Sequence, residues 1–218
     1  MIRTLYHGSN RIIESPVFGC GNPHNDYGMG FYCCTNKSLA REWAVRKNSD
    51  GFVNVYTLRD DRLRILDLTK GKNHEVVLWV SILMQHRSIA EELRALYKRE
   101  LDYLFHNYAV QMDAYDVVIG YRADDAYYRF PEAFVRGELT IESLERIFHA
   151  DAFGKQYVLV SKRAFKDVKF VRYEEVKEEQ KISYYARVHK ANDLFQKTLL
   201  EERYEKGTRL RDLVLSNE

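Results

Sequence analysis

The feature that most constrains the fold of this chain is the order of its predicted elements. Between residues 3 and 173, strand-like segments come first and last, and helical segments lie mainly between them. Apolar, β-branched and aromatic runs typical of strands occur at 3–7, 31–34, 52–58, 63–68, 115–119, 155–161 and 168–173. Apolar positions at helical spacing predict helices over 36–47, 74–86, 88–108, 125–136 and 140–149. Strands that come early and late around a helical middle predict an α+β fold.

Four of these helix ends carry recognisable signals. Thr35 or Asn36 is expected to cap the first helix, and Thr140 the helix that it begins. Ser88 and Glu91 have the spacing of a capping box. Gly137 is expected to end the helix over 125–136, which should be interrupted near its proline.

The last 45 residues differ from the rest in composition, because charges crowd in and proline is absent. One or two helices are expected over 182–215. We therefore expect a domain over 1–173 and a helical C-terminal extension over 174–218 that either packs on it or binds a partner. An apolar stripe at helical spacing could serve either role, and it consists of Tyr184, Val188, Ala191, Leu194, Phe195, Leu199 and Leu200.

The charge balance and the apolar runs exclude several classes of protein. The 218 residues carry 34 basic and 32 acidic side chains, too even a balance for a general electrostatic grip on nucleic acid or an anionic membrane. The longest charge-poor run is too short to span a bilayer, and the first ten residues lack the apolar run of a signal peptide. A cytoplasmic protein is expected. Cys20, Cys33 and Cys34 match neither a disulfide framework nor a zinc site, so no metal is expected.

Two glycine-containing segments precede or follow predicted strands. His7 ends the first strand, where its ring can face a cleft, and Gly8 would let a ligand approach the backbone closely. Gly28 and Gly30 come just before the strand of Tyr32 and allow a tight turn that presents this ring to a flat ligand. The alternative for both segments is structural, a strand that ends in a turn and a turn that feeds a core strand.

Two further residues are candidates by position. Trp43 lies eleven residues after Tyr32 on the following helix, so the two rings could line one slot, although tryptophan in such a helix is often part of the core. Gln156 stands at the start of a buried strand, where it either caps the strand end or reaches into a site.

A cysteine hydrolase is an alternative from the same segments. It would use Cys33 or Cys34 as the nucleophile and His7 or His24 as the base. This chemistry needs a thiol of low pKa within hydrogen-bond reach of the base.

Taken in order, these segments resemble the ADP-ribosyltransferase superfamily. The pattern is closest to its His-Tyr-Glu branch, which diphtheria-type toxins and poly(ADP-ribose) polymerases share. The segments LYHGS, YGMGFYCCTNKSLAREWA, YDVVIGYRADDAYYRF and KQYVLVSKRAF more closely resemble a bacterial family of ADP-ribosyltransferase-like proteins. The resemblance covers residues 3–172 and implies a split β-sheet core with a helical insertion.

The resemblance also implies how NAD would be bound as a co-substrate. His7 would hydrogen-bond a ribose hydroxyl, and the Gly8 backbone would hold the nicotinamide carboxamide. Ser9 would reach the adenosine ribose. Tyr32 and Trp43 would enclose the nicotinamide ring from its two faces.

The chain departs from the superfamily where the catalytic glutamate is expected, because Gln156 stands there. Glutamine can hold a ribose hydroxyl but brings no negative charge to the cation-like transition state. Asp124 or Asp125 could supply a carboxylate instead, and Arg122 could contact the pyrophosphate, although these residues also suit a solvated helix start. The related bacterial family carries glutamine here, which favours transfer of one unit over chain elongation.

These observations predict an NAD-dependent mono-ADP-ribosyltransferase that modifies an intracellular macromolecule, as a bacterial toxin or defence effector. A neutralising partner protein could then dock on the C-terminal helices. The alternative is a catalytically weak scaffold of the same fold that binds NAD or a partner. The acceptor can be protein, nucleic acid or a small molecule.

Overall fold

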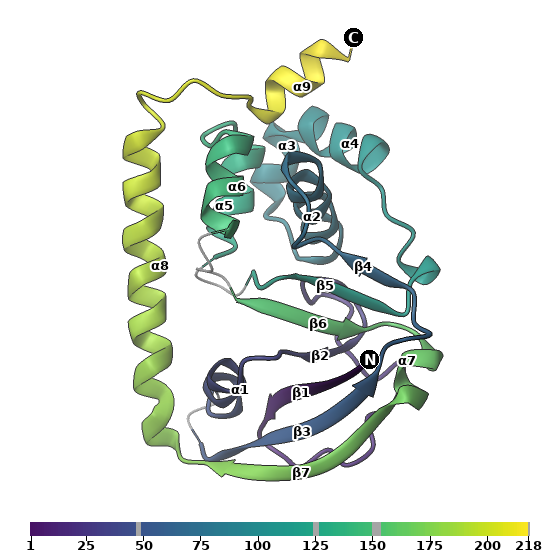
Figure 1. Ribbon diagram of the computed structural model, residues 1–218. Coiled ribbons are helices and arrows are strands. Elements are labelled where there is room, and N and C mark those ends of the chain that lie inside the picture. The colour runs from purple at the N-terminus through teal and green to yellow at the C-terminus, as the bar shows by residue number, and fades with distance from the viewer. Residues whose placement is uncertain (47–48, 124–126, 150–153, 218) are drawn as a thin grey trace.

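The computed structural model describes residues 1–46, 49–123, 127–149 and 154–217 and has the expected mixed α+β composition (Figure 1). The strands are β1 (Ile2–Ser9), β2 (Phe31–Cys33), β3 (Gly51–Arg59), β4 (Ile65–Asp67), β5 (Val117–Tyr121), β6 (Lys155–Leu159) and β7 (Val168–Val176). The helices are α1 (Lys37–Ala44), α2 (Asn73–His86), α3 (Glu91–Leu96), α4 (Lys98–Asn107), α5 (Arg129–Val135), α6 (Ile141–His149), α7 (Lys162–Asp167), α8 (Ile182–Glu201) and α9 (Leu210–Ser216). Short 3₁₀ turns occupy Met112–Ala114 and Glu178–Lys181.

The strands form two sheets that pack over a shared hydrophobic cluster and are joined by one pair of backbone hydrogen bonds. The first sheet has the antiparallel order β1-β3-β7, and the second has the order β2-β6-β5-β4, in which β4 and β5 run parallel. Tyr6 of β1 and Cys34, just after β2, exchange two backbone hydrogen bonds of 2.8 and 2.9 Å. β1 and the end of β2 are therefore held side by side between the two sheets (Figure 1).

The central helices cover the second sheet with an aromatic core. More than half of the residues of α2 are buried, and its Trp79 lies against Phe148 of α6 with ring centroids 4.4 Å apart. The Trp79 indole also donates a 3.1 Å hydrogen bond to the backbone oxygen of Tyr121, at the end of β5. This packing fixes the end of β5 that directly precedes Arg122.

The C-terminal extension packs against α1 and against the main hydrophobic core. α8 runs along the side of the molecule from the end of β7 to the helices above the second sheet (Figure 1). Its Ala191 and Phe195 are buried in the main hydrophobic core, where Phe195 meets Phe130 at 5.0 Å between ring centroids. Near its start, Arg187 forms a 2.7 Å ion pair with Glu42 of α1, and both side chains are buried.

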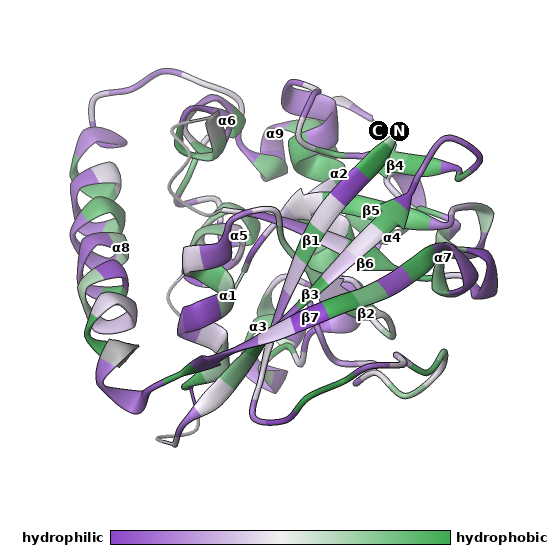
Figure 2. Ribbon diagram, turned by 60° about the horizontal axis from the view of Figure 1, so that its bottom comes forward, coloured by the Kyte–Doolittle hydropathy of each residue, from purple (hydrophilic) through white to green (hydrophobic). Residues whose placement is uncertain are grey.

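The hydropathy of α8 agrees with this placement, since hydrophobic and hydrophilic residues alternate along it (Figure 2). Much of the apolar stripe predicted from the sequence therefore lies against the protein's own core, although Leu200 is exposed. A neutralising partner on these helices stays a prediction, and it would contact the outward face of α8. Over the described ranges, each helix is too short or too polar to cross a bilayer.

Several of the predicted helix ends are confirmed. The Asn36 side chain accepts a 2.9 Å hydrogen bond from the Ser38 backbone and caps α1. Thr140 accepts from the Ser143 backbone at the start of α6. Gly137 has a φ of 69° just after α5, a conformation that glycine adopts without strain.

Other expectations for the helices are wrong. The expected capping box is absent, because α3 begins after Ala90, whose side chain makes no capping bond. The long helix over 88–108 is divided at Tyr97 into α3 and α4. Pro131 lies in the first turn of α5, where its missing N–H costs no helical hydrogen bond, and so does not interrupt the helix. The short helix α7, capped by Ser161, was not expected.

Candidate functional site

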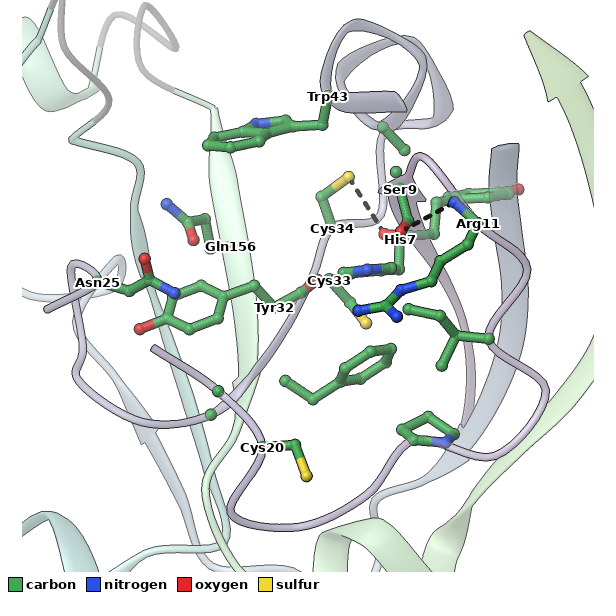
Figure 3. Close-up of a pocket in the computed structure, with 18 of the residues that line it drawn as sticks. His7, Ser9, Arg11, Cys20, Asn25, Tyr32, Cys33, Cys34, Trp43 and Gln156 are labelled. Atoms are coloured by element: carbon green, nitrogen blue, oxygen red, sulfur yellow. Dashed lines mark hydrogen bonds between the residues drawn. The ribbon is translucent and has the colours of Figure 1, made fainter. Parts of the chain in front are cut away.

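A cavity of about 700 Å³ opens where the two sheets meet, beneath the long loop that joins β1 to β2 (Figure 3). Every described residue that the sequence singled out as catalytic or NAD-binding lines it, namely His7, Gly8, Ser9, Tyr32, Trp43, Arg122 and Gln156. They come from β1, β2, α1, the end of β5 and β6. Asp124 and Asp125 lie outside the described residues.

His7 is held in one tautomer by the backbone of β2. Its Nδ1 lies 2.6 Å from the backbone oxygen of Tyr32, and because a carbonyl oxygen only accepts, Nδ1 carries the proton. The ring also stacks on Phe31, with centroids 4.5 Å apart. Burial lowers the pKa of His7, and the hydrogen bond to Tyr32 only partly opposes this. The neutral ring therefore leaves Nε2 as a hydrogen-bond acceptor.

Tyr32 is fixed through its hydroxyl group. The phenol donates a 2.6 Å hydrogen bond to the backbone oxygen of Gly28 and accepts one of 3.0 Å from the backbone N–H of Tyr27. Gly28 has a φ of 71°, so the predicted tight turn is present. Burial raises the pKa of Tyr32, which keeps the phenol protonated. The turn therefore fixes the ring of Tyr32 at the cavity wall. A ligand can contact the ring, whereas the hydroxyl group is already hydrogen-bonded to the turn.

The packing of α1 requires glycine at position 8. A methyl group on Gly8 would lie 2.0 Å from the backbone oxygen of Ala40 and 2.8 Å from the Cβ of Trp43. α1 therefore approaches β1 closely at this residue, and the approach of a ligand to the Gly8 backbone stays a prediction. The neighbouring Ser9 hydroxyl accepts a 3.3 Å hydrogen bond from the Arg11 backbone.

Trp43 contacts cationic groups. The guanidinium carbons of Arg46 and Arg122 lie 4.5 and 5.0 Å from the centroid of the indole. Cation–π attraction therefore contributes to holding the indole and both arginines together. Figure 3 shows Gln156 between Trp43 and Tyr32, so the two rings do not stack directly on each other.

Sequence reasoning missed Asp26, a buried carboxylate of the β1–β2 loop that also lines the cavity. Its Oδ2 accepts hydrogen bonds of 2.9 Å from Nε2 of Gln156 and from the backbone N–H of Ala123. Its Oδ1 accepts from Arg87, at 3.1 Å, in a mostly buried ion pair. The one sequence signal is its position directly before the Tyr27-Gly28 turn, because its partners are distant in the chain.

The cysteine hydrolase alternative does not fit this geometry. Burial raises the pKa of the Cys34 thiol to about 11 and also raises that of Cys33. The Cys34 thiol donates to the backbone oxygen of Asn36, at 3.1 Å. A nucleophilic cysteine needs the opposite shift. In the part of the chain that the structure describes, no three His, Cys, Asp or Glu side chains gather as a metal site would require.

A family model described as "Protein of unknown function (DUF3990)" matches residues 3–170. The chain belongs to the DUF3990 family. No curated protein and no solved structure matches the chain. The DUF3990 match contains all the cavity residues named above and ends within β7, so that α8 and α9 follow it.

The charges that line the cavity of this DUF3990 member are mainly basic. The lining residues of the described ranges include four arginines, Arg11, Arg46, Arg87 and Arg122, against the two acids Glu14 and Asp26. Aromatic rings and neutral hydrogen-bonding groups complete the walls. This combination suits a ligand that carries both anionic groups and a flat ring.

Proposed function

We propose that this chain binds NAD in the cavity and transfers a single ADP-ribose unit to an intracellular macromolecule, as a bacterial toxin or defence effector. The observation that carries the proposal is that one cavity contains His7, Tyr32 and Gln156, contributed by β1, β2 and β6. These are the residues that the resemblance to the His-Tyr-Glu branch assigns to catalysis. On this proposal the two sheets are an ADP-ribosyltransferase-like split core.

The residues of the cavity fit the chemical groups of NAD. The Nε2 atom of His7 can accept a hydrogen bond from a ribose hydroxyl, and the fixed ring of Tyr32 offers a flat surface for nicotinamide. Arg46 and Arg122, which flank the Trp43 indole, are planar donors that suit phosphate oxygens. A cavity of about 700 Å³ is also within the usual range for sites of small ligands.

The proposed transfer exchanges one bond for another at the ribose. The bond between ribose and nicotinamide breaks, and its electron pair leaves with nicotinamide. A nucleophilic group of the acceptor bonds to the same ribose carbon and loses its proton to water or a base. Gln156 would hold a ribose hydroxyl during this step, and His7 would hold another.

The test is labelling of a bacterial lysate with NAD that carries a label on its adenosine part, together with measurement of released nicotinamide. The variants Tyr32→Ala and His7→Ala are expected to lower both signals about 100-fold, as misplaced substrate does. Tyr204→Ala and His189→Ala are matched controls, because these side chains are 89% and 82% exposed. Equal labelling by the wild-type chain and all four variants would refute the proposal.

A second candidate is a module that binds NAD or a partner without transfer. The uncharged Gln156 favours it, since a carboxamide stabilises a developing positive charge less than a carboxylate does. Isothermal titration with NAD distinguishes the two functions. Saturable binding without nicotinamide release over long incubation would support the module, and release that follows protein concentration would support the enzyme.

A further inference from the structure

We propose that Asp26 is a positioning residue that orients Gln156 and supplies the negative charge that this glutamine lacks. The inference rests on the proposed function and deepens it. In the superfamily that the chain resembles, a single glutamate would supply both the hydrogen bond and the charge. Here Gln156 would supply the hydrogen bond to the ribose, and Asp26 behind it would supply the charge.

The hydrogen bond between the two side chains determines which end of the carboxamide is free. An ionised carboxylate only accepts, so Asp26 binds the amide nitrogen of Gln156, at 2.9 Å. The amide oxygen is then the free end of the side chain, and it can accept a hydrogen bond from a ribose hydroxyl. Without Asp26, nothing in this contact would favour the oxygen over the nitrogen at that position.

The surroundings of Asp26 provide hydrogen-bond donors to both of its carboxylate oxygens. Arg87 bonds Oδ1 at 3.1 Å, and the Ala123 backbone N–H bonds Oδ2 at 2.9 Å. Charge-assisted hydrogen bonds of this kind favour the carboxylate over the protonated acid. The carboxylate, whose other oxygen is paired with Arg87, therefore lies one amide group away from the atom that would contact the ribose, in a mostly buried environment where charges are weakly screened.

The test exchanges the carboxylate of Asp26 and the carboxamide of Gln156 between the two positions. Asp26→Asn removes the charge, and the double variant Asp26→Asn with Gln156→Glu restores it one side chain closer to the ribose. Asp26→Asn is expected to lower kcat for nicotinamide release about 10- to 100-fold, the range seen when the outer partner of a site residue is lost, with a smaller change in KM for NAD. The double variant is expected to recover most of that loss.

A purely structural role for Asp26, in holding Arg87 and Ala123, predicts a different result. Its loss would then lower the unfolding temperature and activity together, and Gln156→Glu would not restore either. Thermal unfolding of each variant separates the two roles. Asp102→Asn, at an exposed aspartate on α4, is the control and should leave kcat unchanged.

Gln156→Glu alone gives a second readout that does not require Asp26→Asn to fold. Two carboxyl groups at hydrogen-bond distance bind a proton between them, so one has a raised pKa. The profile of kcat against pH should gain an ionisation that the second carboxyl group shifts to higher pH, and neither the wild type nor the double variant should show this shifted ionisation. Three results would overturn this inference and leave the proposed function intact, provided that the wild-type chain is active. They are an unchanged kcat in Asp26→Asn, a double variant that recovers no activity, and an unchanged pH profile in Gln156→Glu. A wild-type chain that releases no nicotinamide would overturn the proposed function, and this inference with it.

Discussion

Replacing Glu42 by glutamine should lower the free energy of unfolding by about 3 kcal/mol, because it removes the negative charge that pairs with the mostly buried guanidinium of Arg187. The two side chains are 7% and 13% exposed and lie 2.7 Å apart. They join α1, which carries Trp43, to α8 of the C-terminal extension. The pair is therefore one electrostatic link between the extension and one wall of the cavity, and Lys37 of α1 forms another with Glu174.

The magnitude follows from the burial and the separation of the charges. Two unit charges about 4 Å apart at an effective dielectric constant of 20 attract by about 4 kcal/mol. Removal of one partner of a buried pair costs about 3–5 kcal/mol. The glutamine oxygen can still accept a hydrogen bond from Arg187, which places Glu42→Gln at the lower end of this range.

Urea unfolding followed by circular dichroism measures the loss. With a slope of about 2–3 kcal/mol per molar urea for a chain of this size, the midpoint should fall by about 1 M. Asp102→Asn breaks the exposed pair with Lys98 and should change the unfolding free energy by less than about 1 kcal/mol. A midpoint shift for Glu42→Gln no larger than that of Asp102→Asn would refute the reasoning.

Three further predictions concern the cavity wall. Tyr32→Phe should lower the unfolding free energy by about 1–2 kcal/mol, because the hydrogen bond to the backbone oxygen of Gly28 is lost. In titrations with NAD, Tyr32→Phe should bind more tightly than Tyr32→Ala, because only the alanine variant also loses the ring. Gly8→Ala should cost about 3 kcal/mol in urea unfolding, because the added methyl group meets the backbone of Ala40, and a neutral effect would contradict the close packing of α1 on β1. Because burial lowers the pKa of His7, its contribution to stability is present above the unfolded pKa of about 6.5 and is lost as pH falls from there toward the folded value. A His7→Asn chain should therefore lose less stability than the wild type between about pH 6.5 and 5, and equal losses in thermal unfolding would contradict this.

Features that depend on neighbours in the sequence were predictable. The positions of the strands along the chain and the cap at Asn36 follow from local patterns of apolar and capping residues. The sequence also singled out His7, Tyr32 and Gln156, because each lies at the end or start of a strand beside a local signal. The cavity brings these three residues together, and their roles remain predictions.

Features that depend on distant partners were not predictable. Asp26 looks like an ordinary loop residue, because its bonds reach Arg87, Ala123 and Gln156 on other elements. The division between α3 and α4 at Tyr97 has no glycine or proline to mark it. The packing of α1 against Gly8 could not be predicted either, because the sequence does not show that α1 would approach β1 at that residue.

The bonds of Asp26 also have a kinetic consequence. They span 130 positions to Gln156 and 97 to Ala123, so the β1–β2 loop cannot be fixed until β5 and β6 have paired. Closure of such long loops costs conformational entropy that local helices do not have to overcome. The cavity should therefore consolidate late during folding, and its loop should exchange amide hydrogens faster than α2 in the native state. On this basis, heating would abolish ligand binding at temperatures where most of the chain is still folded.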